Sequence, residues 1–216
     1  MDVVARLCEG ELRPLRLLAA DGLHDSAFKS LHERGEGQEL VRQQYTGRYP
    51  FELLQNANDA AWDAGSRGRV HFLLTETALI VADNGFGFGD EQVNAICSLG
   101  RSSKGPGEAV GHKGLGFKSV GEITDHPQIT SARASFQFSS ERVWTDVSAI
   151  LGALPAGQKL PVYAFPFPVE AGDFGPDAGR VAELRGDGFT TVIRLPFSEG
   201  VGREIVEKHC RPPAVV

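Results

Sequence analysis

Residues 111–119 read GHKGLGFKS, and this stretch restricts the fold more than any other part of the sequence. Its three glycines leave backbone N–H groups free to surround a phosphate, and a helix that begins near Phe117 would add the partial positive charge of its N-terminus. Because Phe117 separates Gly116 from Lys118, the segment is not a P-loop, in which the glycine and lysine are adjacent. The segment therefore predicts a phosphate-binding loop, with a flexible surface loop as the alternative.

Residues 52–60, ELLQNANDA, lie in a predicted helix with polar side chains beside its apolar stripe. At about 100° per residue, Glu52, Asn56 and Asp59 fall within about 60° of one another. A helix with one face in solvent would place its charges opposite the apolar stripe. The arrangement favours the wall of a polar pocket, in which a carboxylate can act as general base and an amide oxygen can bind magnesium. Surface charges on an amphipathic helix are the alternative.

Residues 81–89, VADNGFGFG, follow an apolar strand. Asp83 and the alternating glycines predict a tight turn, where a flat ligand can approach the backbone and a buried carboxylate can accept a hydrogen bond from an exocyclic amine. An EF-hand is excluded because its oxygen ligands and final glutamate are missing. A dinucleotide-binding fingerprint is excluded because its third glycine is missing.

The hydrophobic pattern predicts alternating groups of helices and strands around these segments. We expect helices over 3–40, with breaks near 21–22 and 35–37, and over 49–64, with Gly65 just beyond the C-terminus. A short helix should run from Asp90 to Gly100, another should begin near Phe117, and a last one should cover 202–210. Strands are expected over 70–75, 78–82, 128–138, 162–167 and 190–196, and loops over 101–116 and 171–188.

The composition is that of a globular protein with a real core. Of the 216 residues, 41% are hydrophobic, and the net charge of -6 provides no overall attraction for nucleic acid or anionic lipid. The three cysteines have neither metal-site nor disulfide-framework spacing. Acidic residues interrupt any apolar run near the N-terminus, so we expect a cytoplasmic protein that does not bind membranes.

Taken together and in this order, the three segments resemble the N-box, the adenine box and the lid box of the GHKL (Bergerat-fold) ATPase superfamily. Within it, GRSSK at 100–104 followed by GHKGLGFKSV is most similar to the sacsin and No Vein type of ATP-binding domain. The resemblance implies an α+β fold, a two-layer α/β sandwich whose mixed, largely antiparallel sheet is covered by helices. It also implies ATP and Mg2+ as ligands.

The resemblance assigns roles to individual residues. Glu52 resembles the water-activating base, Asn56 the magnesium ligand and Asp83 the adenine-recognising carboxylate. The family's strand threonine falls on Thr190 or Thr191, and we assign it to Thr190. The other positions implied near the nucleotide are Asp59, Ala60, Gly85, Gly87, Ser103, Lys104, Gly111, His112, Lys113, Gly114, Leu115, Gly116 and Phe117.

These observations predict an N-terminal helical segment over 1–44, the ATP-binding domain over 45–200 and a C-terminal tail over 201–216. Truncation of a longer chain would explain why the tail is short. Many family members complete hydrolysis with a residue from a second domain, and the sequence after Leu195 is too short to supply one. We expect Mg-dependent ATP binding and hydrolysis, with lid closure that drives conformational change. A further domain, a partner protein or a nucleotide-dependent dimer would complete the ATPase.

Two alternatives stay open from the sequence. One is a regulatory module that binds nucleotide without hydrolysing it. The other is the catalytic domain of a histidine kinase, with His24 or His32 as the phosphate acceptor. In the sequence, the glycines after His32 predict a broken helix and so count against the kinase.

Overall fold

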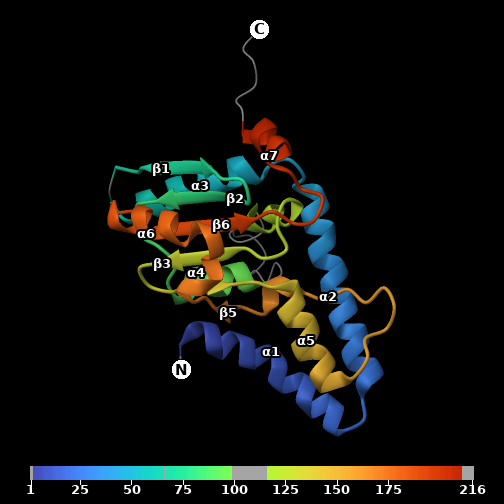
Figure 1. Cartoon of the computed structure of the whole chain (residues 1–216). Coiled ribbons are helices and arrows are strands. Elements are labelled where there is room, and N and C mark those ends of the chain that lie inside the picture. The colour runs from blue at the N-terminus through green and yellow to red at the C-terminus, as the bar shows by residue number, and fades with distance from the viewer. Residues whose placement is uncertain (1, 66, 99–115, 211–216) are drawn as a thin grey trace, which may run out of the picture.

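A computed structural model describes residues 2–65, 67–98 and 116–210 (Figure 1). Its centre is a six-stranded sheet in the order β1-β2-β6-β3-β4-β5, in which every neighbouring pair is antiparallel. The expected α+β fold, a two-layer sandwich with a largely antiparallel sheet covered by helices, is therefore confirmed. The sheet was expected to be mixed, whereas all of its described pairs are antiparallel. The strands are β1 (Val70–Leu74), β2 (Ala78–Asp83), β3 (Gln128–Ser131), β4 (Phe136–Gln137), β5 (Phe167–Pro168) and β6 (Thr191–Pro196).

Helices surround this sheet and supply most of the remaining ordered backbone. None of those in the described residues is both long enough and apolar enough to cross a membrane. The α-helices are α1 (Val3–Ala20), α2 (His24–Gln44), α3 (Tyr49–Asp63), α4 (Asp90–Cys97), α5 (Ser140–Leu151), α6 (Ala178–Gly186) and α7 (Arg203–Cys210), and the 3-10 helices are η1 (Gly116–Glu122), η2 (Val162–Ala164) and η3 (Ala171–Asp177).

Side chains that alternate along the central strands create two different faces. Val81 and Ile193 belong to the main core, which also contains residues of α3, α4 and η1. Ile80 and Val192 point the other way, into a smaller core with residues of η3 and α6. Figure 1 shows α6 in front of the sheet and α3 behind it. The principal helical layer thus covers the first face, and α6 covers part of the second.

A third core joins α1, α2 and α5. In contrast to the break expected near Gly35, α2 is one continuous helix. The expectation was wrong because this glycine serves a close packing contact. A Cβ at Gly35 would lie 2.6 Å from the backbone carbonyl carbon of Lys159, so only glycine lets the loop from residue 159 approach the helix.

Several local predictions are confirmed. Helix α3 has Pro50 in its first turn, and Gly65 follows it with φ of 62°. The β1–β2 hairpin forms although its turn residues are weak formers, because the Thr75 hydroxyl accepts hydrogen bonds from the N–H groups of Thr77 and Ala78 at 3.3 and 3.0 Å. Strand β6 and helix α7 also lie where the pattern placed them.

Other predictions were wrong between residues 128 and 188. The strand expected over 128–138 is two strands, β3 and β4, and the one over 162–167 is η2 followed by β5. The loop expected over 171–188 contains η3 and α6. Helix α5 was not predicted, although Ser139 caps it by accepting the Arg142 N–H at 3.2 Å and three residues on its buried face have helical spacing: Val143, Val147 and Leu151.

A buried ion pair links the second face of the sheet to its covering helix. The guanidinium Nε of Arg194 on β6 lies 2.7 Å from Asp177 Oδ2, and both side chains are 7% exposed. Gln128 on β3 accepts a second guanidinium N–H at 2.8 Å, and Thr77 donates to Asp177 at 3.1 Å. This network ties the end of η3, where α6 begins, to two strands, β6 and β3, and to the β1–β2 turn.

We expect Asp177→Ala to lower the free energy of unfolding by about 3–5 kcal/mol, because it leaves the Arg194 charge buried without its carboxylate. The double variant Asp177→Ala/Arg194→Met should recover much of this loss. The exposed pair Arg180–Glu183 on α6 provides the control, and Glu183→Ala should cost less than about 1 kcal/mol. Urea unfolding of the four proteins measures these differences, and equal losses for Asp177→Ala and Glu183→Ala would contradict the assigned role.

Candidate functional site

A cavity of about 140 Å³ opens on the first face of the sheet, between α3, the β2–α4 turn, α4, η1 and β6. We call it the Asp83 cavity. Polar groups from α3 and β2 line one part of it, and aromatic and aliphatic side chains line the rest. It brings together most of the predicted site residues that the structure describes, namely Asn56, Asp59, Ala60, Asp83, Gly87 and Phe117.

Asp83 is the buried acidic group of this cavity, at 7% exposed. One carboxylate oxygen accepts the Gly85 N–H at 2.9 Å, and no other described residue donates to the carboxylate. Burial raises its pKa to about 6, although the Gly85 hydrogen bond acts in the opposite direction. Asp83 can therefore accept a hydrogen bond from a ligand amine near neutral pH, in surroundings where a hydrogen bond to a charged group is strong.

The turn after Asp83 lies directly on α3. A Cβ at Gly85 would come within 2.5 Å of the Ala60 Cβ, and the Phe86 N–H donates to the Ala60 carbonyl at 2.9 Å. Ala60 and Gly85, both predicted site positions, are thus small because a larger side chain at either one would overlap the other. The contact holds the carboxylate on β2 at a fixed distance from the polar side chains of α3.

Gly87 occupies the left-handed region, with φ of 83°. A Cβ there would lie 2.6 Å from Ser131 Oγ, the same oxygen that accepts the Phe88 N–H at 2.8 Å. Ser131, at the end of β3, therefore supports the turn from the neighbouring strand. Sequence reasoning missed it because one serine in a strand carries no signal until the β3–β6 register places it opposite Thr191.

The two candidate threonines have separate places. Thr191 lines the Asp83 cavity, whereas Thr190 does not. The Thr190 hydroxyl donates to the Gly85 carbonyl at 2.6 Å, and its N–H donates to the Asp83 carbonyl at 2.8 Å. Because adjacent strand residues point to opposite faces, only one of the pair can face the cavity. Thr190, the residue that we assigned to the family's strand threonine, thus ties the turn after β2 to β6 and does not line the cavity.

Glu52 lies one turn before Asn56 on α3 but does not line the Asp83 cavity. Its side chain is 16% exposed. The carboxylate is 3.7 Å from the Arg48 guanidinium and packs against Gly116, where any Cβ would collide with it. Gly116 is the first residue of η1, and the next residue, Phe117, is buried against the cavity. The predicted base therefore sits where η1 begins, beside the cavity and not inside it.

Lys118, the residue after Phe117 in η1, is buried. Its ammonium group points to the end of α4, where it donates to the carbonyls of Ile96 and Ser98 at 2.8 and 3.0 Å. A cation at a helix C-terminus is favoured by the helix dipole. Desolvation by burial lowers the Lys118 pKa to about 8. This lysine joins η1 to α4, two elements that line the cavity.

The rest of the predicted phosphate-binding and lid positions lie outside the described residues. They are Ser103, Lys104, Gly111, His112, Lys113, Gly114 and Leu115. Within the described segments, no group of three or more His, Cys, Asp or Glu side chains is arranged to hold a metal ion. If these segments bind magnesium, they would therefore supply fewer than three such side chains as ligands.

The two histidines weighed as phosphate acceptors both lie on α2, which is unbroken. His24 Nδ1 is 3.0 Å from the Leu151 carbonyl. His32 Nδ1 accepts the Lys159 N–H at 3.1 Å, and its Nε2 lies 3.4 Å from Glu36. The continuity of α2 removes the helix-break argument against a kinase, while these contacts account for both imidazoles structurally.

One curated protein provides a comparison. Protein NO VEIN from Arabidopsis thaliana is 30% identical to this chain over 200 residues, which make up 90% of the chain. The chain spans only 7% of the length of that relative. No protein-family model matches the chain. The similarity thus relates nearly the whole chain to one segment of a much longer protein.

We expect Gly85→Ala to destabilise the protein by about 1–3 kcal/mol, because the added methyl group overlaps Ala60. Gly179 on α6 has no atom within 4 Å of the position that a Cβ would take, so Gly179→Ala should be neutral or stabilising by up to about 1 kcal/mol. Chemical denaturation of both variants checks this. A neutral Gly85→Ala change would show that the close approach of the turn to α3 is not needed.

The raised pKa of Asp83 predicts a pH-dependent stability. The Asp83 carboxyl keeps its proton up to about pH 6 in the folded protein, whereas its ordinary pKa is 3.8. The folded protein therefore loses stability as the pH rises from about 3.8 to about 6, because the buried group becomes charged. Asp83→Asn should raise the stability of the ligand-free protein at pH 8 by about 1–3 kcal/mol, and by less at pH 5. Thermal unfolding at both pH values tests it, and a destabilised variant at pH 8 would contradict it.

Proposed function

We propose that this chain is a GHKL-type, NO VEIN-related module that binds Mg-ATP, with adenine in the Asp83 cavity. The observation that carries the proposal is a buried carboxylate at the end of a strand, with an oxygen left for a ligand amine, beside glycines that let a flat ring approach the backbone. The cavity volume of about 140 Å³ is of the order that takes a small aromatic ligand, roughly 150 Å³ for benzene in an engineered core.

Magnesium fits the residues at the rim of this cavity. Asn56 lines it and can offer one amide oxygen, and Asp59 and Asp63 lie on the same side of α3. Magnesium retains several waters and takes phosphate oxygens, so one protein oxygen beside a bound triphosphate is a sufficient contribution from this helix. The ion would supply charge neutralisation for the phosphates.

Hydrolysis is the second part of the proposal, with Glu52 as general base. Its carboxylate packs against Gly116, the residue at which the predicted phosphate-binding segment joins η1. Closure of that segment over the nucleotide would bring the phosphates toward Glu52. A further domain, a partner protein or a second copy of the chain would supply the remaining catalytic group, in keeping with the similarity to a segment of a longer protein.

A non-hydrolysing regulatory module is the second candidate, and one observation favours it. Glu52 lies outside the Asp83 cavity, and its carboxylate is 3.7 Å from the Arg48 guanidinium and does not join the polar side chains that line the cavity. On this alternative the chain would change conformation on binding and release ATP unchanged.

Calorimetric titration with ATP and magnesium tests binding. Wild type should bind, and Asp83→Asn should weaken binding at least about tenfold, since the variant loses a charged hydrogen-bond acceptor. Asp21→Asn, at the exposed end of α1, is the matched control and should bind as wild type does. No binding by wild type, or equal binding by Asp83→Asn, would refute the adenine assignment.

Phosphate release separates the two candidates. Glu52→Gln should retain ATP binding and lose turnover if Glu52 is the base. Turnover that survives Glu52→Gln would remove Glu52 from that role. The regulatory module would be favoured if wild type binds ATP but releases no phosphate, both at low protein concentration and at concentrations high enough to form dimers.

A further inference from the structure

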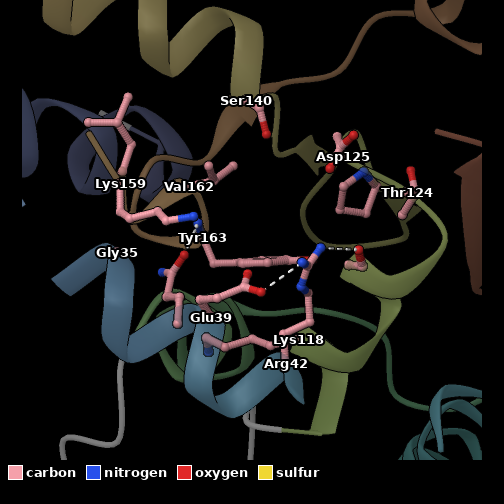
Figure 2. A pocket seen from close by; sticks show the side chains of 14 residues that line it. Gly35, Glu39, Arg42, Lys118, Thr124, Asp125, Ser140, Lys159, Val162 and Tyr163 are labelled. Carbon is pink, nitrogen blue, oxygen red and sulfur yellow. Dashed lines mark hydrogen bonds and ion pairs between the residues drawn. The ribbon is translucent and has the colours of Figure 1, made fainter. Parts of the chain in front are cut away.

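A second cavity, also about 140 Å³, lies between α2, η1 and the segment from residue 159 to 163 (Figure 2). We call it the Gln38 cavity. It shares η1 with the Asp83 cavity, since Lys118 lines the one and Phe117 lines the other. Among the described residues, its lining is separate from the positions assigned to the nucleotide. Its walls are mostly polar and charged, which sets it apart from the hydrophobic cores around it.

Gln38 carries the strongest sign of a missing partner. Its side chain is 7% exposed, and its amide oxygen accepts the Tyr163 N–H at 3.3 Å. The amide nitrogen Nε2 is buried and has no hydrogen-bond partner among the described residues. A buried N–H group without an acceptor costs free energy, and such groups are rare in native proteins. The wall therefore presents a donor that needs an acceptor.

A second donor lies close by. The hydroxyl group of Tyr163 makes no hydrogen bond to a described residue, while the ring is packed edge-on against Phe117 and lies within 5.9 Å of the Lys118 ammonium. A Cβ at Gly121 would lie 3.4 Å from this hydroxyl oxygen, so the glycine keeps space open beside it.

Charged side chains of both signs line the cavity. Arg42, Lys118 and Lys159 are basic, and Glu39 and Asp125 are acidic. Part of the positive charge is already engaged, because Arg42 donates to the Gly121 carbonyl at 3.0 Å and Lys118 donates to carbonyls at the end of α4. Figure 2 shows Glu39 and Arg42 together on α2, joined by a hydrogen bond of 2.8 Å. Burial alone would raise the pKa of Glu39, but hydrogen bonds from Arg42 and Gln43 and the charge of Lys159 lower it. Asp125 and Lys159 are both exposed, so solvent screens the charge of each.

We propose that the Gln38 cavity binds a small oxyanion, a phosphate or carboxylate group, between the Gln38 amide, the Tyr163 hydroxyl and the basic side chains of Arg42 and Lys159. A cation is disfavoured because the groups without partners in the described parts are donors, and the Glu39 carboxylate already accepts hydrogen bonds from Arg42 and Gln43. A volume of about 140 Å³ has room for a single phosphate or a short carboxylic acid. The site is independent of the proposed ATP function.

The side-chain amide resonances of Gln38 in 15N-labelled protein give a direct test. We expect them to shift on titration with sodium phosphate or sodium acetate, and not with sodium chloride at matched ionic strength. The two arms separate phosphate from carboxylate preference. Gln38→Glu assigns the resonance, because it keeps the acceptor for the Tyr163 N–H and replaces only the free donor.

Calorimetry on variants then ties binding to the cavity. Gln38→Glu should lower phosphate or acetate affinity at least about tenfold, since a donor is replaced by a negative charge. Lys159 is exposed, so Lys159→Gln should fold normally and lower the affinity several-fold. Asp83→Asn is the control and should bind the anion as wild type does, which separates this site from the proposed nucleotide site.

Three results would overturn the proposal. One is unshifted Gln38 resonances with both anions, which would mean that the cavity holds only water. Another is anion affinity unchanged in both Gln38→Glu and Lys159→Gln. The third is anion binding lost in Asp83→Asn, which would place the anion in the Asp83 cavity. If Gln38→Glu does not fold, Lys159→Gln and the wild-type resonances still decide the matter.

Discussion

The close approach of α3 to the turn after β2 is the constraint on which the candidate site depends. Ala60 and Gly85 touch with so little space that neither position accepts a larger side chain without displacement of the helix or the turn. The Phe86 N–H bond to the Ala60 carbonyl fixes the same contact by hydrogen bonding. Because the helix is held there, its polar edge and the buried Asp83 face one another across a small volume.

Side chains of successive strand residues point to opposite faces of the sheet, so neighbouring residues near this contact have different functions. Asp83 and Thr191 face the cavity, while Thr190 ties the turn backbone to β6, and Arg194 anchors η3 and α6 on the opposite face. The 3-10 helix η1 also has two roles. Phe117 closes one cavity and Lys118 borders the other, and the lysine also holds the end of α4.

Much of this arrangement could be predicted from local chemistry. The polar edge of α3 and the glycine turn after Asp83 follow from helical angles and from strand-end patterns within a few residues. The role of Ser131 and the choice between Thr190 and Thr191 depend on strand register, which involves residues distant in sequence. The prediction at Gly35 failed for a related reason, since this glycine contacts a loop far away in the sequence, at Lys159.

The position of the predicted base depends on neighbours that helical geometry does not specify. That geometry places Glu52 on the same edge as Asn56, but it does not determine which groups occupy the space in front of each. Arg48 and Gly116 decide this for Glu52. Helix α5, in contrast, has a clear local signal in its capping serine and apolar spacing, so its position was predictable.

The position of β6 has a consequence for biosynthesis. It is the last strand among the described residues, yet it lies between β2 and β3 and bridges the two halves of the sheet. A nascent chain that has emerged only as far as α6 therefore holds two unjoined sheet fragments with exposed edges, and the floor of the Asp83 cavity lacks its β6 half. Non-local pairing of this kind folds slowly and exposes strand edges to aggregation, so the newly made chain depends on rapid capture of its final strand.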